Sequence, residues 1–345
     1  MIFDLKSNKA KYIKLLKEIK SYDLHFDYNY LMITEGIYIN HNGESHANPV
    51  FFSYQQNDQK FILPFYIIKT KLSNGEVIVD GETPYGYPGA LSNSTNNSFL
   101  ERALEKLKSD LVQAGLLNFL VRNNPLLNTE IFIKTKKVST GQVVLADLHK
   151  SDVPEDIVSN SALRNIKKAI RNNLQVKILN TEQVDQSIVN EFYDLYIKTM
   201  ERNDAKDFYF FKYEYIRDLI YYKNSLLFAV YLDNNPIAFM LHLEDQNILY
   251  YHLGASDTKH FDLRPNDYLY YQTIKYSLNN NNQYICWGGG ATSKKDDGLL
   301  RFKKKFGNLM KDNYINKIVI NEEKYDSLKK EYDYNGSLLQ FYKFD

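Results

Sequence analysis

The feature that most constrains the fold is an order of strand-like and helix-like segments that occurs twice along the chain. The first half contains three strand-like segments, a helix-like segment and a closing strand, at residues 50–55, 61–69, 76–80, 98–115 and 118–122. The second half repeats this order at residues 226–232, 237–243, 248–254, 267–277 and 284–287. Turn-forming Asn, Asp and Gly residues between successive strands predict antiparallel pairing. The repetition predicts two copies of one structural unit.

The second copy is extended on its N-terminal side. Residues 161–173 have the pattern of a basic amphipathic helix, residues 174–179 that of a strand, and residues 184–200 that of a long helix. The resulting order, β-α-α-β-β-β-α-β, is similar to that of GNAT-type acyltransferases. In such a unit the last two strands are parallel and are joined by a crossover helix. They diverge to admit an acyl-pantetheine arm, and the N-terminus of the helix attracts its pyrophosphate.

Composition narrows the class of protein further. The chain has 345 residues, of which 44% are hydrophobic, enough for two domains. Its net charge of +1, from 43 basic and 42 acidic residues, argues against a protein that works mainly by binding DNA. The chain lacks a signal-peptide pattern and a membrane-spanning apolar stretch, and Cys286 is its single cysteine. We therefore expect a cytoplasmic protein with no membrane insertion.

Two short segments resemble phosphate-binding loops. The turn at 261–266 lacks both glycines of a developed GNAT phosphate loop, although Arg264 can still pair with a phosphate. Glycines 288–290 are followed by lysines, but a Walker-type loop would need Gly-Lys-Ser/Thr at the start of a helix. We expect these glycines to end the closing strand beside the acyl slot, where backbone must approach the ligand closely. The alternative is a glycine-rich turn that binds no ligand.

Four segments in order resemble the C-terminal domain of the Fem-type (FemAB-like) branch of the GNAT superfamily: "ILYYHLGASD", "RPNDYLYYQTIKYS", "YICWGGG" and "LLRFKKKFG". Further similarity is found in "LYIKTMERNDAKDFYFF", "SALRNIKKAIRNN", "TPYGYPGAL" and "NFLVRNNPLLN". The resemblance covers roughly residues 50–310. It implies an α/β fold with mixed sheets and two GNAT-like domains in tandem. We expect an acceptor-side domain at 1–150, a donor-side domain at 151–317, and a tail at 318–345 that packs on the first domain.

The resemblance also implies roles for individual residues. Phe302-Lys303 corresponds to a pair at the active centre of Fem-type enzymes, where the lysine holds a substrate diphosphate or the oxyanion of acyl transfer. Arg202 matches an arginine that contacts diphosphate. Tyr251 matches a tyrosine near the substrate. Expected at the acceptor site, where aromatic rings stack on a base or sugar, are Tyr85 and Tyr87. The expected contacts with acyl-CoA, a co-substrate rather than a resident cofactor, are Arg264, Asn266, Trp287, Gly288 and Gly289.

Some of these residues have simpler explanations. A lysine run such as 303–305 also fits a solvated helix face, and Arg202 also fits a surface ion pair. His252 is a candidate general base for an attacking amine, although a core histidine bonded to backbone is commoner. His41 and His46 lack an accompanying carboxylate cluster, so we expect no metal site. No nucleophile-elbow pattern is present, which favours direct acyl transfer.

Three functions fit this sequence. The first is an N-acyltransferase that moves an acyl group from acyl-CoA to a nucleotide-linked amino-deoxysugar, for surface polysaccharide such as O-antigen or capsule. The second is a Fem-type ligase that moves an amino acid from aminoacyl-tRNA to a peptidoglycan precursor. The third is a non-catalytic ligand-binding relative. Because binding to tRNA favours broad basic surfaces, the net charge of +1 favours the first function.

Overall fold

The computed structural model describes residues 1–20, 22–38 and 45–344. The chain divides into two compact units. Unit 1 comprises Met1–Thr140 and Asn313–Asp345, and unit 2 comprises Gly141–Asp312. The divisions therefore fall after Thr140 and after Asp312, whereas the sequence analysis places them after residues 150 and 317.

Unit 1 contains a mixed sheet in the order β1-β2-β3-β4-β6-β13, with β5 paired to β3. The strands are β1 (Ile2–Asp4), β2 (Ala47–Gln56), β3 (Gln59–Lys71), β4 (Val77–Glu82), β5 (Leu91–Ser92), β6 (Asn118–Arg122) and β13 (Leu309–Val319). The α-helices are α1 (Lys9–Ile19), α2 (Tyr28–Thr34), α3 (Asn97–Gln113) and α10 (Glu322–Glu331). A 3-10 turn, Phe341–Phe344, follows α10. Only β4 and β6 pair in parallel in this unit, as expected for strands joined through a crossover helix.

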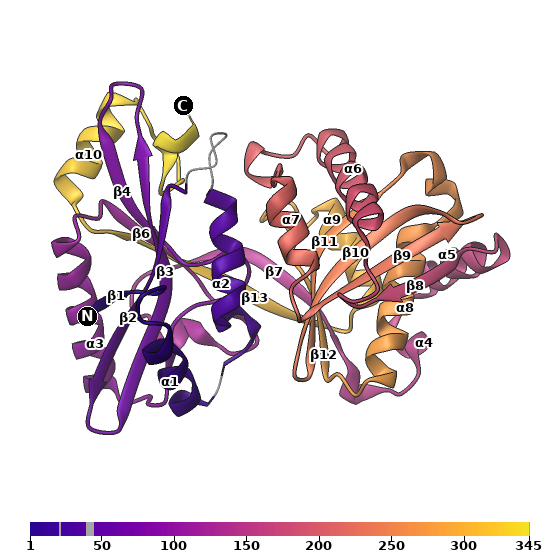
Figure 1. Cartoon of the computed structure of the whole chain (residues 1–345), viewed down its shortest axis with the longest axis horizontal. Helices are drawn as coiled ribbons and strands as arrows, with labels where there is room; N and C mark the ends of the chain where they lie inside the picture. The colour runs from indigo at the N-terminus through magenta and orange to yellow at the C-terminus, as the bar shows by residue number, and fades with distance from the viewer. Residues whose placement is uncertain (21, 39–44, 345) are drawn as a thin grey trace. The chain divides into compact units, whose positions relative to one another are not determined.

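Helices cover both faces of this sheet (Figure 1). Figure 1 shows α3 on one side of the sheet, and α1 and α2 on the other. One hydrophobic core joins Phe99, Ala103 and Leu107 of α3 to the sheet. A second core joins Leu15 and Leu16 of α1 to Phe51 and Ile62 on the opposite face. Because alternate strand residues face opposite sides of a sheet, the two cores draw on alternate positions of the same strands.

In unit 2 the strands have the order β7-β12-β11-β10-β9-β8, again with mixed pairing. The strands are β7 (Lys137–Asp147), β8 (Gln175–Leu179), β9 (Ser225–Leu232), β10 (Asn235–Asp245), β11 (Ile248–Ser256) and β12 (Tyr284–Gly288). The helices are α4 (Pro154–Ile157), α5 (Asn160–Arg171), α6 (Gln186–Arg202), α7 (Tyr213–Ile220), α8 (Pro265–Asn279) and α9 (Gly298–Lys303). Here β11 and β12 are the parallel pair, joined through α8.

The helices of unit 2 also lie on both faces of their sheet. Met240 contributes to the core that contains α5 and α8, with Ile166 and Leu269 among its members. The neighbouring Phe239 points the other way and contacts Phe192 of α6, with ring centroids 5.7 Å apart. Since successive strand residues face opposite sides, α5 and α8 cover one face and α6 covers the other.

Both units contain the predicted β-β-β-α-β order, and the predicted mixed α/β fold class is confirmed. The sequence analysis missed β1, β5, β7, β13, α2, α4, α7, α9 and α10. In the described part of the chain, no helix is long and apolar enough to cross a membrane.

Candidate active site

The parallel strands β11 and β12 separate soon after they begin. They pair over only three residues each, from Ile248 with Tyr284 to Tyr250 with Cys286. β11 then continues to Ser256, paired only with β10 in the described part of the chain. The edge of β11 that faces away from β10 therefore has no neighbouring strand beyond Tyr250. A sheet edge of this kind presents backbone N–H and C=O groups that an extended ligand can bond.

Helix α6 contacts the C-terminal end of β11, where this unpaired edge ends. The backbone N–H of Ser256 donates to Thr199 Oγ1 at 3.1 Å. Arg202 donates to the carbonyl oxygen of Ser256 at 3.0 Å, and its guanidinium lies 4.9 Å from the ring centroid of Phe261. Burial lowers the pKa of Arg202. In this structure Arg202 fixes the end of β11, so the diphosphate contact expected for it remains a prediction.

The three glycines after β12 shape the turn that leads to α9. Gly288 has φ of 77°, a left-handed conformation that L side chains rarely adopt. A Cβ atom at Gly290 would overlap the carboxylate of Asp297. That carboxylate accepts hydrogen bonds from the backbone N–H groups of Ala291, Thr292 and Leu300, and so caps α9. The three glycines are therefore required to position the start of α9.

Helix α9 carries Lys303 to the point where β11 and β12 separate. The Lys303 side chain is buried, with 4% of its surface exposed. Its Nζ donates to the carbonyl oxygen of Gly289 at 2.8 Å and lies 4.9 Å from the ring centroid of Tyr251. Among the described residues, no carboxylate lies within ion-pair distance of Nζ, although Asp297 interacts with it electrostatically over a longer range. Burial lowers the pKa of Lys303 to about 8. By contrast, Lys304 is exposed.

Aromatic side chains of α8, β12 and α9 form the wall beside Lys303. Tyr270 lies at their centre, with ring centroids 4.4 Å from Trp287, 5.2 Å from Phe302 and 6.1 Å from Tyr251. Burial raises the pKa of Tyr251 to about 12, so this hydroxyl stays protonated. Trp287 is fully buried and donates from Nε1 to the carbonyl oxygen of Phe306 at 2.7 Å. In this structure Trp287 packs in the wall, and the ligand contact expected for it remains a prediction.

His252 lies apart from this wall. The pairing of β10 with β11 shifts at a β-bulge, where Leu241 opposes Leu253 and His242 opposes Tyr251, leaving His252 as the extra residue. The Nε2 atom of His252 is 3.2 Å from the hydroxyl of Tyr215 in α7. Tyr251 instead packs toward α8 and Lys303. The structure therefore brings Lys303 and Tyr251 together but not His252.

The start of α8 differs from a phosphate-binding helix terminus. Arg264 caps the helix with φ of 67° and is exposed, and Asn266 Nδ2 donates to Ser256 Oγ at 3.3 Å. Asp267, in the first turn, is 5% exposed and accepts from Asn165 Nδ2 at 2.9 Å. Burial raises its pKa, and the hydrogen bond from Asn165 opposes that shift. A carboxylate here already occupies the position where the helix dipole favours an anion.

Tyr85 and Tyr87 belong to unit 1, in a loop of residues 83–89 that we call the tyrosine loop. Both side chains are partly exposed. The carbonyl oxygen of Tyr85 accepts from the hydroxyl of Tyr30 at 2.8 Å. Gly86 has φ of 98°, and a Cβ atom there would lie 2.8 Å from Cδ2 of the buried His25. Close packing therefore fixes the backbone of this loop.

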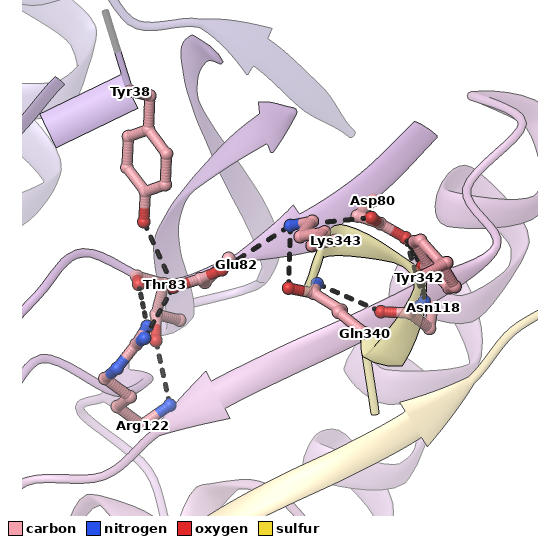
Figure 2. Close-up of polar contacts among 9 residues, drawn as sticks. All are labelled: Tyr38, Asp80, Glu82, Thr83, Asn118, Arg122, Gln340, Tyr342 and Lys343. Atoms are coloured by element: carbon pink, nitrogen blue, oxygen red, sulfur yellow. Dashed lines mark hydrogen bonds and ion pairs between the residues drawn. The ribbon is translucent and has the colours of Figure 1, made fainter. Parts of the chain in front are cut away.

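A cluster of charged residues lies at the carboxyl ends of β4 and β6, where the tyrosine loop begins (Figure 2). Arg122 donates to Glu82 Oε1 at 2.5 Å and to the carbonyl oxygen of Thr83 at 2.8 Å. The hydroxyl of Tyr38 donates to the same Glu82 oxygen at 3.1 Å. Burial raises the pKa of Glu82, but Arg122 and Lys343 outweigh it, and the pKa is lowered.

The sequence analysis did not identify this cluster. The signal was available: Asp80 and Glu82 end an apolar strand, and Arg122 ends another. Charged side chains at the carboxyl ends of neighbouring parallel strands often surround a ligand site. Among the described residues, no group of three His, Cys, Asp or Glu side chains has an arrangement that could hold a metal ion; His41 lies outside these residues.

Comparisons with known proteins agree with this geometry. Residues 160–304 match the family described as acetyltransferase (GNAT) domain. A search of curated proteins found no match. Among solved structures, FemX is 13% identical with a TM-score of 0.60, covering 90% of this chain and 100% of FemX.

A second solved structure is the C-terminal domain of a protein described as a lysylphosphatidylglycerol synthetase from Agrobacterium fabrum. It is 12% identical with a TM-score of 0.57, and the match covers 93% of this chain and 96% of that domain. At these identities the two structures establish similarity of fold. Together with the family match, they show that the chain has a GNAT-like fold.

Proposed function

We propose that the chain transfers an acyl group to an amine at the point where β11 and β12 separate. The observation that carries this proposal is the position of Lys303. Its buried Nζ lies between Gly289, just after β12, and Tyr251, the first residue of β11 beyond the paired region. A buried cation without a carboxylate partner is costly, and an anionic group at this position would compensate it.

The positive charge of Lys303 suggests how acyl transfer proceeds. The amine attacks the acyl carbonyl carbon directly, and negative charge develops on the carbonyl oxygen. Lys303 stabilises this oxyanion, or the charge of a bound phosphate, from a site with little access to water. As the tetrahedral intermediate collapses, the bond to the leaving group breaks, and the leaving group takes up the proton that the amine loses. No covalent bond to the protein forms in this sequence.

For the substrates, we infer an acyl-CoA donor and a nucleotide-linked amino sugar acceptor, which places the protein in the cytoplasm. The match of residues 160–304 to the GNAT acetyltransferase domain supports the donor. The tyrosine loop supports the acceptor, since Tyr85 and Tyr87 offer partly exposed rings for stacking on a base or sugar. A net charge of +1 agrees with a small-molecule donor better than with tRNA.

One observation favours a second candidate, transfer of an amino acid from aminoacyl-tRNA to a peptidoglycan precursor. The buried carboxylate of Asp267 lies in the first turn of α8, where a CoA pyrophosphate would otherwise bind the helix N-terminus. An aminoacyl ester donor would not need a pyrophosphate site at this helix. The proposed contacts of the donor, whichever class it is, therefore remain Arg264, Asn266, Trp287, Gly288 and Gly289.

The two candidates are separated by one assay of donor use. The purified chain is incubated with a panel of acyl-CoA thioesters and with UDP- or dTDP-linked amino sugars, and thiol release is measured. We expect thiol release that depends on both substrates. Transfer from charged tRNA to a peptidoglycan precursor without thiol release would select the second candidate. No transfer with either donor class would leave only a non-catalytic ligand-binding protein.

A further inference from the structure

The last residues of the chain are docked on the charged cluster of unit 1. Phe341 and Tyr342, which are 6% and 2% exposed, pack with Ile78 and Leu117 in a hydrophobic core. The hydroxyl of Tyr342 donates to Asp80 Oδ1 at 2.6 Å, and Asn118 Nδ2 donates to the same oxygen at 2.8 Å. We call residues 340–344 the C-terminal turn. Its docking is specific, because it combines apolar packing with hydrogen bonds to buried groups.

Lys343 connects this turn to two carboxylates of β4. Its Nζ lies 3.5 Å from Asp80 Oδ2 and 4.0 Å from Glu82 Oε2, and it donates to Gln340 Oε1 at 2.7 Å (Figure 2). Asp80 and Glu82 are two residues apart on one strand and both are buried, so their charges repel each other. Lys343 and Arg122 together balance this pair of charges.

Glu82 connects Lys343 to the tyrosine loop through Arg122. It holds the guanidinium of Arg122, which in turn donates to the carbonyl oxygen of Thr83 at the start of the loop. The backbone N–H of Arg122 also donates to Thr83 Oγ1 at 2.8 Å. Lys343 lies beside Oε2 of Glu82, whereas Arg122 bonds Oε1. Without Lys343 the Glu82 carboxylate would be held from one side only, and the contact of Arg122 with the loop would loosen.

We propose that the C-terminal turn positions the tyrosine loop, through Lys343, Glu82 and Arg122, and so takes part in acceptor binding. The residues of the turn are positioning residues and do not touch the acceptor. Binding of the acceptor to the loop and docking of the turn are consequently linked, and each favours the other. The part that concerns acceptor binding rests on the proposed function, whereas the coupling between turn and loop does not.

Hydrogen exchange of the full chain tests the coupling without any ligand. In Lys343→Met, we expect amides of residues 83–89 to exchange about 10-fold faster, while peptides of α3 and α8 are unchanged. Tyr342→Phe keeps the ring in its core and removes only the hydroxyl, so it should give a smaller effect in the same loop. Lys343→Arg should restore protection. The control is Lys324→Met, which removes a surface ion pair with Glu76 at 2.6 Å in the same unit.

Faster exchange of residues 340–344 in Lys343→Met, with the tyrosine loop unchanged, would overturn the proposal. The same variants are then measured in the transfer assay, with a UDP-linked amino sugar as acceptor. There Lys343→Met should raise the acceptor KM about 10-fold and leave kcat unchanged, because the turn acts on binding alone. A fall in kcat at unchanged KM would contradict the role in acceptor binding. Absence of transfer in the wild type would refute the proposed function but not the coupling, which the exchange data decide.

Discussion

Lys303 is the residue on which the proposed chemistry depends most. Replacing it with Met keeps the packing of the stem beside Tyr251 and removes the charge. We expect kcat/KM to fall about 10²-fold, since loss of one charge that stabilises an oxyanion costs roughly 3 kcal/mol. Lys304→Met is the matched control, because Lys304 is exposed, and its kinetics should equal those of the wild type. Equal, small losses of kcat/KM in both variants would indicate that lysines 303–305 form only a solvated surface.

The pKa of Lys303 makes activity depend on pH in a defined direction. Burial lowers this pKa from 10.5 to about 8, so the protonated fraction falls as pH rises through that value. If the charge stabilises the oxyanion, kcat should decrease above pH of about 8. Lys303→Arg keeps a charge to much higher pH, and the alkaline decrease should move upward with it. An alkaline limb that is identical in wild type and Lys303→Arg would assign the titration to another group.

Among the elements, the glycine turn between β12 and α9 sets the position of Lys303. Gly290→Ala places a methyl group against the Asp297 carboxylate that caps α9. We expect a loss of about 1–3 kcal/mol in the free energy of unfolding, together with a lower kcat/KM. Gly298→Ala is the control, because a Cβ atom there meets no neighbour within 4 Å. Thermal unfolding of both variants measures the difference, and equal stability of the two would contradict the structural role of Gly290.

The elements also show how far the sequence alone determines the fold. Strands β9, β10 and β11 are apolar runs bounded by turn residues, and they and helix α8 were predicted within a few residues of their observed bounds. β13 has mostly half-buried residues without clear alternation, so its sequence carries little strand signal. It forms because β6, distant in sequence, offers an edge for pairing. Pairing between segments so far apart cannot be read from local periodicity.

The candidate site was predictable to a similar degree. Phe302-Lys303 and the glycine run stand out in the sequence because their residue types are unusual together. Strand alternation predicts that His252 and Tyr251 face opposite sides of the sheet, as they do, but the partner of His252, Tyr215, comes from α7, which the sequence did not reveal. The contacts of Lys343 with Asp80 and Glu82 were also missed, because the sequence alone does not show that these carboxylates lie beside it.

At the scale of the whole molecule, the order of segments predicts which parts can fold alone. Unit 2 is continuous from Gly141 to Asp312, so a fragment of residues 137–312 should unfold cooperatively. A fragment of residues 1–140 lacks β13 and the C-terminal turn, so β6 loses a paired strand, and Ile78 and Leu117 lose their packing against Phe341 and Tyr342. We expect this fragment not to fold, because it exposes both a strand edge and apolar surface that are buried in the whole chain. Cooperative unfolding of fragment 1–140, observed by calorimetry, would contradict this.

The central claim is that the chain joins an acyl group to an amine at the site of Lys303. Mass spectrometry of the acceptor after incubation with either donor class tests this claim most directly. We predict one new amide on the acceptor for each donor molecule consumed, formed by the wild type and reduced about 10²-fold in Lys303→Met. Donor consumption without any amide product, or equal amide formation by wild type and Lys303→Met, would contradict it.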